Sequence, residues 1–226
     1  MCLNIAALTQ FQPVNASLLA KIKSTNPPIV KPGAPGDDSR AITVEESLAM
    51  GSTSLTDADT SFMQNMILHH GQAVEMVALI EKRTNHRGIS LLGKRISLSQ
   101  KAEINMMRKW LSRRGQEIET KGGHGVHSMF PMSDMVKPSE TPIMVGMLSP
   151  LQMITLEKAE DKIFERLFLR GMVQHHEGAL HMVQGLLTKP GNGEDPELSN
   201  FLAAINADQS TEILRMKNML LSLKGN

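Results

Sequence analysis

A string of the form Met-x-x-His-His-x-x-Ala-x-x-Met-Val occurs twice in this chain, and the second copy begins 106 residues after the first. The first copy runs from Met66 to Val77 and the second from Met172 to Val183. Apolar residues recur within and around each copy at intervals of three and four, which is the period of an α-helix. The repeat therefore predicts a fold in which one helical unit is built twice.

A second apolar pattern of helical period follows each copy of the motif. Ser149 and Pro150 predict the start of the second half, and the apolar stripe predicts one unbroken helix from there to a break at residues 189–193. Two helical hairpins with one long connection indicate an all-α four-helix bundle. The matching residues of the second helix of each hairpin are Gln100, Glu103, Ile104, Met107 and Leu111, and Gln209, Glu212, Ile213, Met216 and Leu220.

These patterns divide the chain into an arm and a duplicated bundle. Residues 1–42 end in a stretch rich in proline and glycine, which opposes helix formation, so we predict a flexible N-terminal arm. The bundle is expected over residues 43–223. Its first half is residues 43–116, its Met-rich and His-rich connector is residues 117–148, and its second half is residues 149–223.

The Met and His residues of each motif share one side of their helix, because each residue advances about 100° around a helix. The alanine at the centre of each motif leaves space between them. A methionine on the following helix adds a further candidate ligand. The candidate metal ligands on the helices are Met66, His69, His70, Met76 and Met107, and Met172, His175, His176, Met182 and Met216.

The connector holds a second set of candidate ligands. Residues 122–148 are too rich in glycine and proline for a stable helix, so their methionines are not explained by a helical core. Exposed methionine is costly unless something binds it. The candidate ligands of the connector are His124, His127, Met129, Met132, Met135, Met144 and Met147.

Imidazole and thioether together indicate copper. Thioether sulfur is a soft ligand that matches Cu(I) and, by the same logic, Ag(I), while histidine lets a site tolerate Cu(II). Glu103 and Gln100, with Glu212 and Gln209, are expected to orient the imidazoles. Acid should release copper bound by histidine near the usual imidazole pKa of about 6.5. The only cysteine is Cys2, which excludes a thiolate cluster.

The same residues are compatible with two other functions. Methionines at helical spacing are also ordinary core residues, so a Met-rich helical interaction module without metal is one alternative. A metal-dependent oxidase is another, although no nucleophile, phosphate loop or Glu-x-x-His motif is present and no enzyme activity is expected. The 24 basic and 23 acidic residues nearly cancel, which argues against a nucleic-acid partner. No apolar run approaches the roughly 20 residues of a membrane span.

The motifs resemble the family of ferritin-like proteins named domain of unknown function 305. The resemblance covers residues 43–223 and implies a ferritin-like four-helix bundle. The residues that carry it are Asp59, Phe62, Met66, His69, His70, Ala73 and Met76; Glu103, Ile104, Met107, Trp110 and Leu111; residues 146–150, Phe168, Met172 and residues 175–179, with Met182; and Glu212, Ile213 and Met216.

The two-copy layout and the Met-rich connector are similar to those of a periplasmic copper-binding member of that family. This resemblance implies a periplasmic or secreted protein that sequesters or hands over Cu(I) in copper resistance and homeostasis. Copper ions would be its partners, together with a copper efflux protein or another copper donor or acceptor. We expect a monomer.

Overall fold

A computed structural model describes residues 27–33, 36, 38–51, 55–119 and 139–223. The chain divides into two compact units, Met1–Ser52 and Thr53–Asn226. The boundary that the sequence suggests at residue 43 falls within the first unit.

The first unit contains a short antiparallel strand pair and one helix. Strand β1 (Ile29–Lys31) pairs with strand β2 (Arg40–Ile42). Helix α2 (Val44–Gly51) begins with a reciprocal cap, in which Glu46 N donates to Thr43 Oγ1 at 3.0 Å and Thr43 N donates to the Glu46 carboxylate at 3.2 Å. Segments of three residues are too short to show an alternating pattern, so the sequence did not predict the strands.

The second unit is all-helical in its described part. Thr56 and Ser149 each close a capping box at a helix start, which satisfies backbone N–H groups that have no partner within the helix. None of the described helices has both the length and the apolar character that crossing a bilayer requires. The helices are α3 (Asp57–Ala78), α4 (Ile80–Arg83), α5 (Arg87–Arg113), α6 (Pro150–Lys158), α7 (Asp161–Leu187) and α8 (Pro196–Ser222).

Two apolar clusters fill the core of the bundle. The Phe168 cluster includes Ala73, Met76, Ile89, Leu92, Ile96, Leu148, Phe164, Phe168, Met172, Ile213 and Met216. The Trp110 cluster includes Phe62, Met63, Met66, Met107, Trp110, Leu111, Ala179, Val183, Leu198, Phe201 and Ile205. Each of the four long helices contributes to both clusters, so the clusters follow one another along the bundle.

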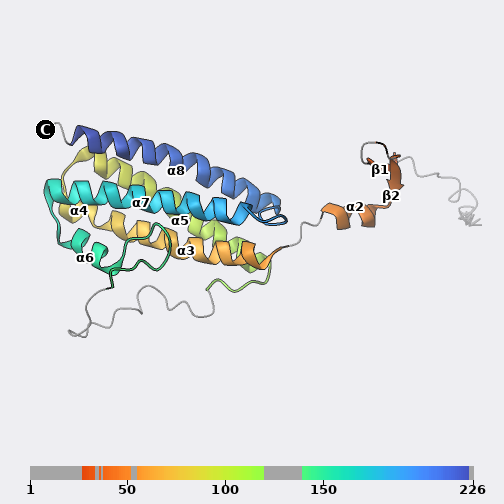
Figure 1. Ribbon diagram of the computed structural model, residues 1–226, viewed down its shortest axis with the longest axis horizontal. Helices are drawn as coiled ribbons and strands as arrows, with labels where there is room; N and C mark the ends of the chain where they lie inside the picture. Colours follow the sequence, from red (N-terminus) through yellow and green to blue (C-terminus); the bar gives the residue numbers. More distant parts are fainter. Residues whose placement is uncertain (1–26, 34–35, 37, 52–54, 120–138, 224–226) are drawn as a thin grey trace, which may run out of the picture. The chain divides into compact units, whose positions relative to one another are not determined.

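The order of these contacts gives the direction of each helix. Helix α3 starts in the Trp110 cluster with Phe62 and ends in the Phe168 cluster with Met76, and α8 runs the same way. Helices α5 and α7 run from the Phe168 cluster to the Trp110 cluster. Because α5 and α7 point in the same direction (Figure 1), the two hairpins are joined by a long crossover. One long crossover of this kind is the ferritin-like arrangement, which confirms the predicted fold class.

The expectation of one unbroken helix after Ser149 is wrong. Helix α6 ends at Lys158, and Ala159 and Glu160 are extended, with ψ of 152° and 162°, before α7 begins. Leu156 and Phe164 lie eight residues apart, a spacing that also fits a continuous helix, so the apolar pattern gave no sign of the break. The first motif helix, in contrast, is interrupted only by Leu79 and reaches Arg83 as α4.

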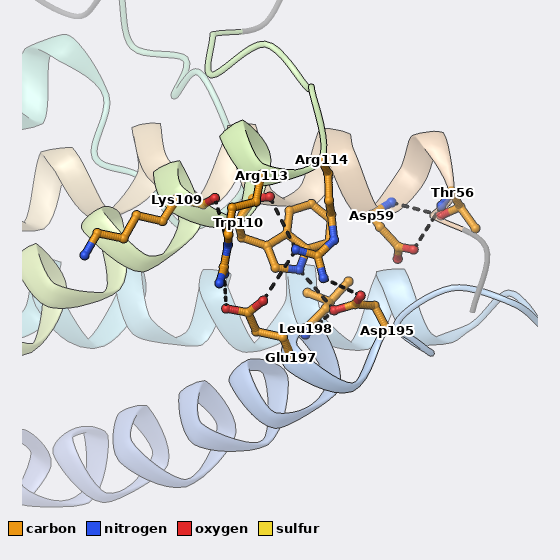
Figure 2. A network of polar contacts seen from close by, with 9 residues as sticks. All are labelled: Thr56, Asp59, Lys109, Trp110, Arg113, Arg114, Asp195, Glu197 and Leu198. Atoms are coloured by element: carbon orange, nitrogen blue, oxygen red, sulfur yellow. Dashed lines mark hydrogen bonds and ion pairs between the residues drawn. The ribbon is translucent and has the colours of Figure 1, made fainter. Parts of the chain in front are cut away.

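A polar network ties the end of α5 to the start of α8 (Figure 2). The Trp110 indole N–H donates to Asp195 Oδ1 at 3.0 Å, and the same oxygen accepts from Leu198 N at 2.9 Å as the helix cap. Arg114 pairs with the other carboxylate oxygen and lies 4.3 Å from the centre of the Trp110 ring. One carboxylate therefore serves a helix cap, a buried indole and a guanidinium.

We expect Asp195→Ala to lower the free energy of unfolding by roughly 2–4 kcal/mol, because the cap is lost and the buried indole N–H loses its partner. Glu197, 37% exposed, pairs with the neighbouring arginines, and Glu197→Ala should cost less than about 1 kcal/mol. Urea denaturation followed by circular dichroism measures both. Equal losses would show that the network acts only through surface charge.

Candidate metal site

A polar layer crosses the core between the two apolar clusters. On each long helix, two polar side chains lie between residues of the Trp110 cluster and residues of the Phe168 cluster. All four imidazoles of the layer have no solvent exposure. The two motifs therefore fold to the same level of the bundle. The polar layer consists of His69 and His70 on α3, Gln100 and Glu103 on α5, His175 and His176 on α7, and Gln209 and Glu212 on α8.

Two of the imidazoles donate to carboxylates. His70 Nε2 lies 2.6 Å from Glu103 Oε2, and His176 Nε2 lies 2.8 Å from Glu212 Oε2. Burial acts to raise the pKa of Glu103, but the hydrogen bond and electrostatic attraction from His70, together with the hydrogen bond from Ser99, outweigh it, and the pKa is lowered. The glutamates thus orient the imidazoles as the sequence suggested.

The glutamines of the layer do not have the role expected of them. The side-chain amide nitrogen and oxygen of Gln209, and the oxygen of Gln100, are buried and make no hydrogen bond within the part of the chain that the structure describes. They stand one helical turn before the glutamates and contribute polar atoms to the core without orienting a histidine.

The other two imidazoles donate to backbone carbonyls. His175 Nε2 donates to the carbonyl oxygen of His69 at 2.8 Å, so the second motif is hydrogen-bonded directly to the first. His69 Nε2 lies 3.1 Å from the carbonyl oxygen of Val145, which belongs to the connector. Carbonyl oxygens only accept, so both bonds place the hydrogen on Nε2.

The Nδ1 atoms of all four histidines are buried and have no hydrogen-bond partner among the described residues. With the hydrogen on Nε2, Nδ1 of a neutral imidazole carries a lone pair. A buried acceptor without a partner costs about 1–3 kcal/mol. Histidines that bind metals characteristically donate their other N–H to a carboxylate or a carbonyl. The polar layer therefore offers four oriented imidazole lone pairs.

The two motifs meet at the centre of the layer. The ring centres of His69 and His175 are 3.9 Å apart, with the ring planes inclined by 40°. Within each motif the ring centres are farther apart, at 6.5 Å for His69 and His70 and 6.3 Å for His175 and His176. The closest pair of imidazoles thus comes from different halves of the chain.

Burial keeps the central pair neutral. Removal from water is the largest cause that lowers the pKa of His69 to about 3, and the nearby His70 lowers it further. Burial, followed by the proximity of His69, also holds the pKa of His175 well below its usual value of 6.5. Neutral imidazole is the form that binds metals. Protons therefore compete for these two nitrogens at lower pH than the sequence alone suggested.

Methionines lie on both sides of the polar layer. Met66 and Met107 belong to the Trp110 cluster, whereas Met76, Met172 and Met216 belong to the Phe168 cluster, and all five are fully buried. The first methionine of each motif stands one helical turn before its histidine pair. Buried thioethers thus lie on both sides of the layer of imidazoles along the core.

The remaining predicted ligands are placed differently. Met182 is partly buried against the Trp110 cluster. Met144 is partly buried, and Met147 is only 1% exposed, so the argument that connector methionines lie outside the packed core does not hold for Met147. The candidates that lie outside the described residues are His124, His127, Met129, Met132 and Met135.

The structure adds residues that motif reasoning missed. Gln72 and Gln174 hydrogen-bond to the connector backbone beside the histidines. In the described ranges, no group of three or more His, Cys, Asp and Glu side chains has the arrangement of a metal site.

The profile of the family described as Domain of unknown function (DUF305) matches residues 59–220, a span that contains the whole polar layer. The chain belongs to the DUF305 family. The first compact unit lies outside the DUF305 match. No curated protein matches the chain significantly.

Solved structures with the DUF305 fold resemble the chain over most of its length. A DUF305 protein from Streptomyces coelicolor, described as secreted, is 25% identical, with 74% of this chain and 94% of that chain covered and a TM-score of 0.61. A DUF305 fragment from Deinococcus radiodurans is 30% identical, with coverage of 73% and 96% and a TM-score of 0.58.

The third similar structure is CopM. In its Cu(I)-bound form CopM is 25% identical to this chain, with 73% of this chain and 96% of CopM covered and a TM-score of 0.53. The Cu(II)-bound form has the same identity and TM-score. This DUF305 chain thus shares its fold with a protein solved with copper in both oxidation states.

Proposed function

We propose that this protein binds copper in the polar layer, with a preference for Cu(I), and that it sequesters or hands over copper in copper resistance. The observation that supports this proposal most is the set of four buried Nδ1 atoms that have no partner in the described part of the chain. Each Nε2 is already committed to an acceptor. The ligand nitrogens are therefore oriented before any metal arrives.

The preference for copper follows from the donor types. Buried thioethers on both sides of the layer are soft donors, which suit Cu(I) and Ag(I) better than zinc or iron. Imidazole donors let the same site accept Cu(II). The similarity to CopM, solved in Cu(I)-bound and Cu(II)-bound forms, supports this assignment.

The proposed site is shared between the two halves of the chain. The 3.9 Å separation of the His69 and His175 rings brings one imidazole of each motif to the same place. The hydrogen bond from His175 to the His69 carbonyl joins the motifs further. A copper ion bound by either imidazole ring would therefore lie beside the other ring.

The proposed role is binding and transfer of copper, not turnover of a substrate. The protein would act in the periplasm or outside the cell, which the similarity to a DUF305 protein described as secreted supports. It would act as a monomer and exchange copper with an efflux protein or another donor or acceptor. The connector histidines and methionines outside the described residues would capture copper before it reaches the bundle.

Anaerobic Cu(I) titration against a competing chelator tests the proposal. The decisive variant replaces His69, His70, His175 and His176 by glutamine, which keeps an N–H donor near the position of Nε2 and removes Nδ1. We expect the variant to keep its helical circular dichroism and to lose the tightest class of bound Cu(I). His181→Gln, a change at an exposed position of α7, is the control. Unchanged tight binding in the fourfold variant would contradict the proposed function.

A further inference from the structure

Residues 145–148, which we call the strap, lie against both motif helices. Gln72 on α3 accepts from Leu148 N at 2.7 Å and donates to Leu148 O at 2.9 Å. Gln174 on α7 donates to Met147 O at 3.1 Å. The carbonyl of Val145 accepts from His69 at 3.1 Å. The strap is therefore bound to the faces that carry the histidines.

Glycine allows the strap to approach α7 closely. A Cβ atom on Gly178 would lie 2.4 Å from Gly146 Cα and 2.5 Å from Val145 O, distances that no side chain permits. Gly146 itself has a φ of +81°, in the left-handed region that glycine favours. The backbones of the strap and of α7 are thus in direct contact, one turn beyond His175.

The strap sits where the two motifs differ from each other. Gln72 and Gly178 occupy the same position of the repeat, and Gln174 is equivalent to Leu68. The residues common to both copies build the polar layer, whereas these differing positions bind the strap. The duplication is therefore broken at the strap-binding positions.

The strap also makes the two halves of the polar layer unequal. His175 donates to the backbone of α3, which is part of the packed bundle. Its counterpart His69 donates to the strap, which has no regular secondary structure and carries the exposed Val145 side chain. His69 is the histidine whose orientation depends on a segment outside the helices.

We propose that the strap controls the entry and release of copper by holding His69, and that its displacement from α3 and α7 opens the polar layer. The inference rests on the proposed copper-binding function. All four imidazoles are fully buried, so an ion cannot reach Nδ1 unless a wall of the site moves. Among the described residues, the four long helices form the packed core, and the strap lies against two of them without helical hydrogen bonds of its own.

Gly178→Ala tests this inference because the added Cβ would displace the strap. Gly185→Ala is a matched control on the same helix, where an added Cβ meets nothing within 4 Å. We expect Gly178→Ala to speed the transfer of bound Cu(I) to a chelator about tenfold, as expected when roughly one hydrogen bond to the strap is lost. The amount of Cu(I) bound should stay the same in both variants.

A second variant covers the case in which Gly178→Ala does not fold. Gln72→Leu with Gln174→Leu removes the polar contacts that bind the strap while keeping the glycine contact. Gln64→Leu is its control, because Gln64 donates to the carbonyl of Glu117 at 2.7 Å and so binds the other end of the connector. Faster transfer in the double variant, and wild-type transfer in Gln64→Leu, is the expected result.

Measurements on metal-free protein distinguish a failure of this inference from a failure of the proposed function. In either strap variant, amides of residues 145–148 should exchange hydrogen faster, and nitrogen NMR of His69 should lose its single Nε2–H tautomer. Wild-type protein that binds no Cu(I) would refute the proposed function. Wild-type rates of Cu(I) transfer in both strap variants would overturn the inference that the strap controls copper entry and release. An unchanged His69 tautomer in both variants would do the same. Either result would leave the proposed copper-binding function standing.

Discussion

The double variant His69→Gln and His70→Gln replaces the histidines of one motif. We expect it to abolish the tightest class of Cu(I) binding and not merely to halve the amount bound. The reason is the contact between His69 and His175, whose ring centres are 3.9 Å apart. We expect a loss of affinity greater than about 100-fold, which exceeds the effect of changing a residue that only orients a ligand. Chelator competition combined with metal analysis after gel filtration gives both affinity and stoichiometry.

The reciprocal variant is the matched test of sharing. His175→Gln with His176→Gln should show the same loss, because each motif contributes one member of the central pair. His181→Gln, on the same helix but exposed, should bind as the wild type does. If each variant of one motif kept half of the copper at wild-type affinity, the two motifs would form independent sites.

Metal-free protein is expected to lose stability as the pH falls below 6.5. The pKa of His69 is lowered from 6.5 to about 3 by burial, so between these values the unfolded chain binds a proton that the folded chain does not. The unfolding free energy then falls with falling pH, by about 1.4 kcal/mol per pH unit for each such histidine. From pH 6.5 to pH 5 this amounts to about 2 kcal/mol for His69, and His175 acts in the same direction.

Urea denaturation at pH 7.5 and pH 5, followed by circular dichroism, measures this loss. His69→Gln should show a flatter dependence on pH, because glutamine does not titrate. His181→Gln should keep the dependence of the wild type. A free energy of unfolding that does not fall between pH 7.5 and pH 5 would show that the buried histidines do not stay neutral.

The fold could be predicted because the repeat carries its own periodicity. Each motif fixed a helix, the glycines and prolines marked the loops, and the duplication required two hairpins. The break between α6 and α7 could not be predicted, since Leu156 and Phe164 keep a helical spacing across it. The break results from the extended backbone of Ala159 and Glu160, and the spacing of apolar residues does not indicate that conformation.

The candidate site could be predicted only in part. The histidines and their glutamates follow from helix geometry, because residues three and four apart share a face. The contact between the two motifs at His69 and His175 depends on how α3 packs against α7, and the sequence repeat does not specify that packing. The strap was missed because its contacts come from Gln72, Gln174 and Gly178, where the two copies differ.

Under the proposed function, the four Nδ1 atoms that lack partners among the described residues make the stability of the fold depend on the supply of copper. An empty layer leaves buried acceptors unsatisfied, whereas an ion that binds only the folded chain stabilises it by mass action. Proteases act on unfolded molecules, so the loaded form should outlast the empty form in the cell. Protein abundance would then rise with available copper at a constant rate of synthesis, without a dedicated sensor.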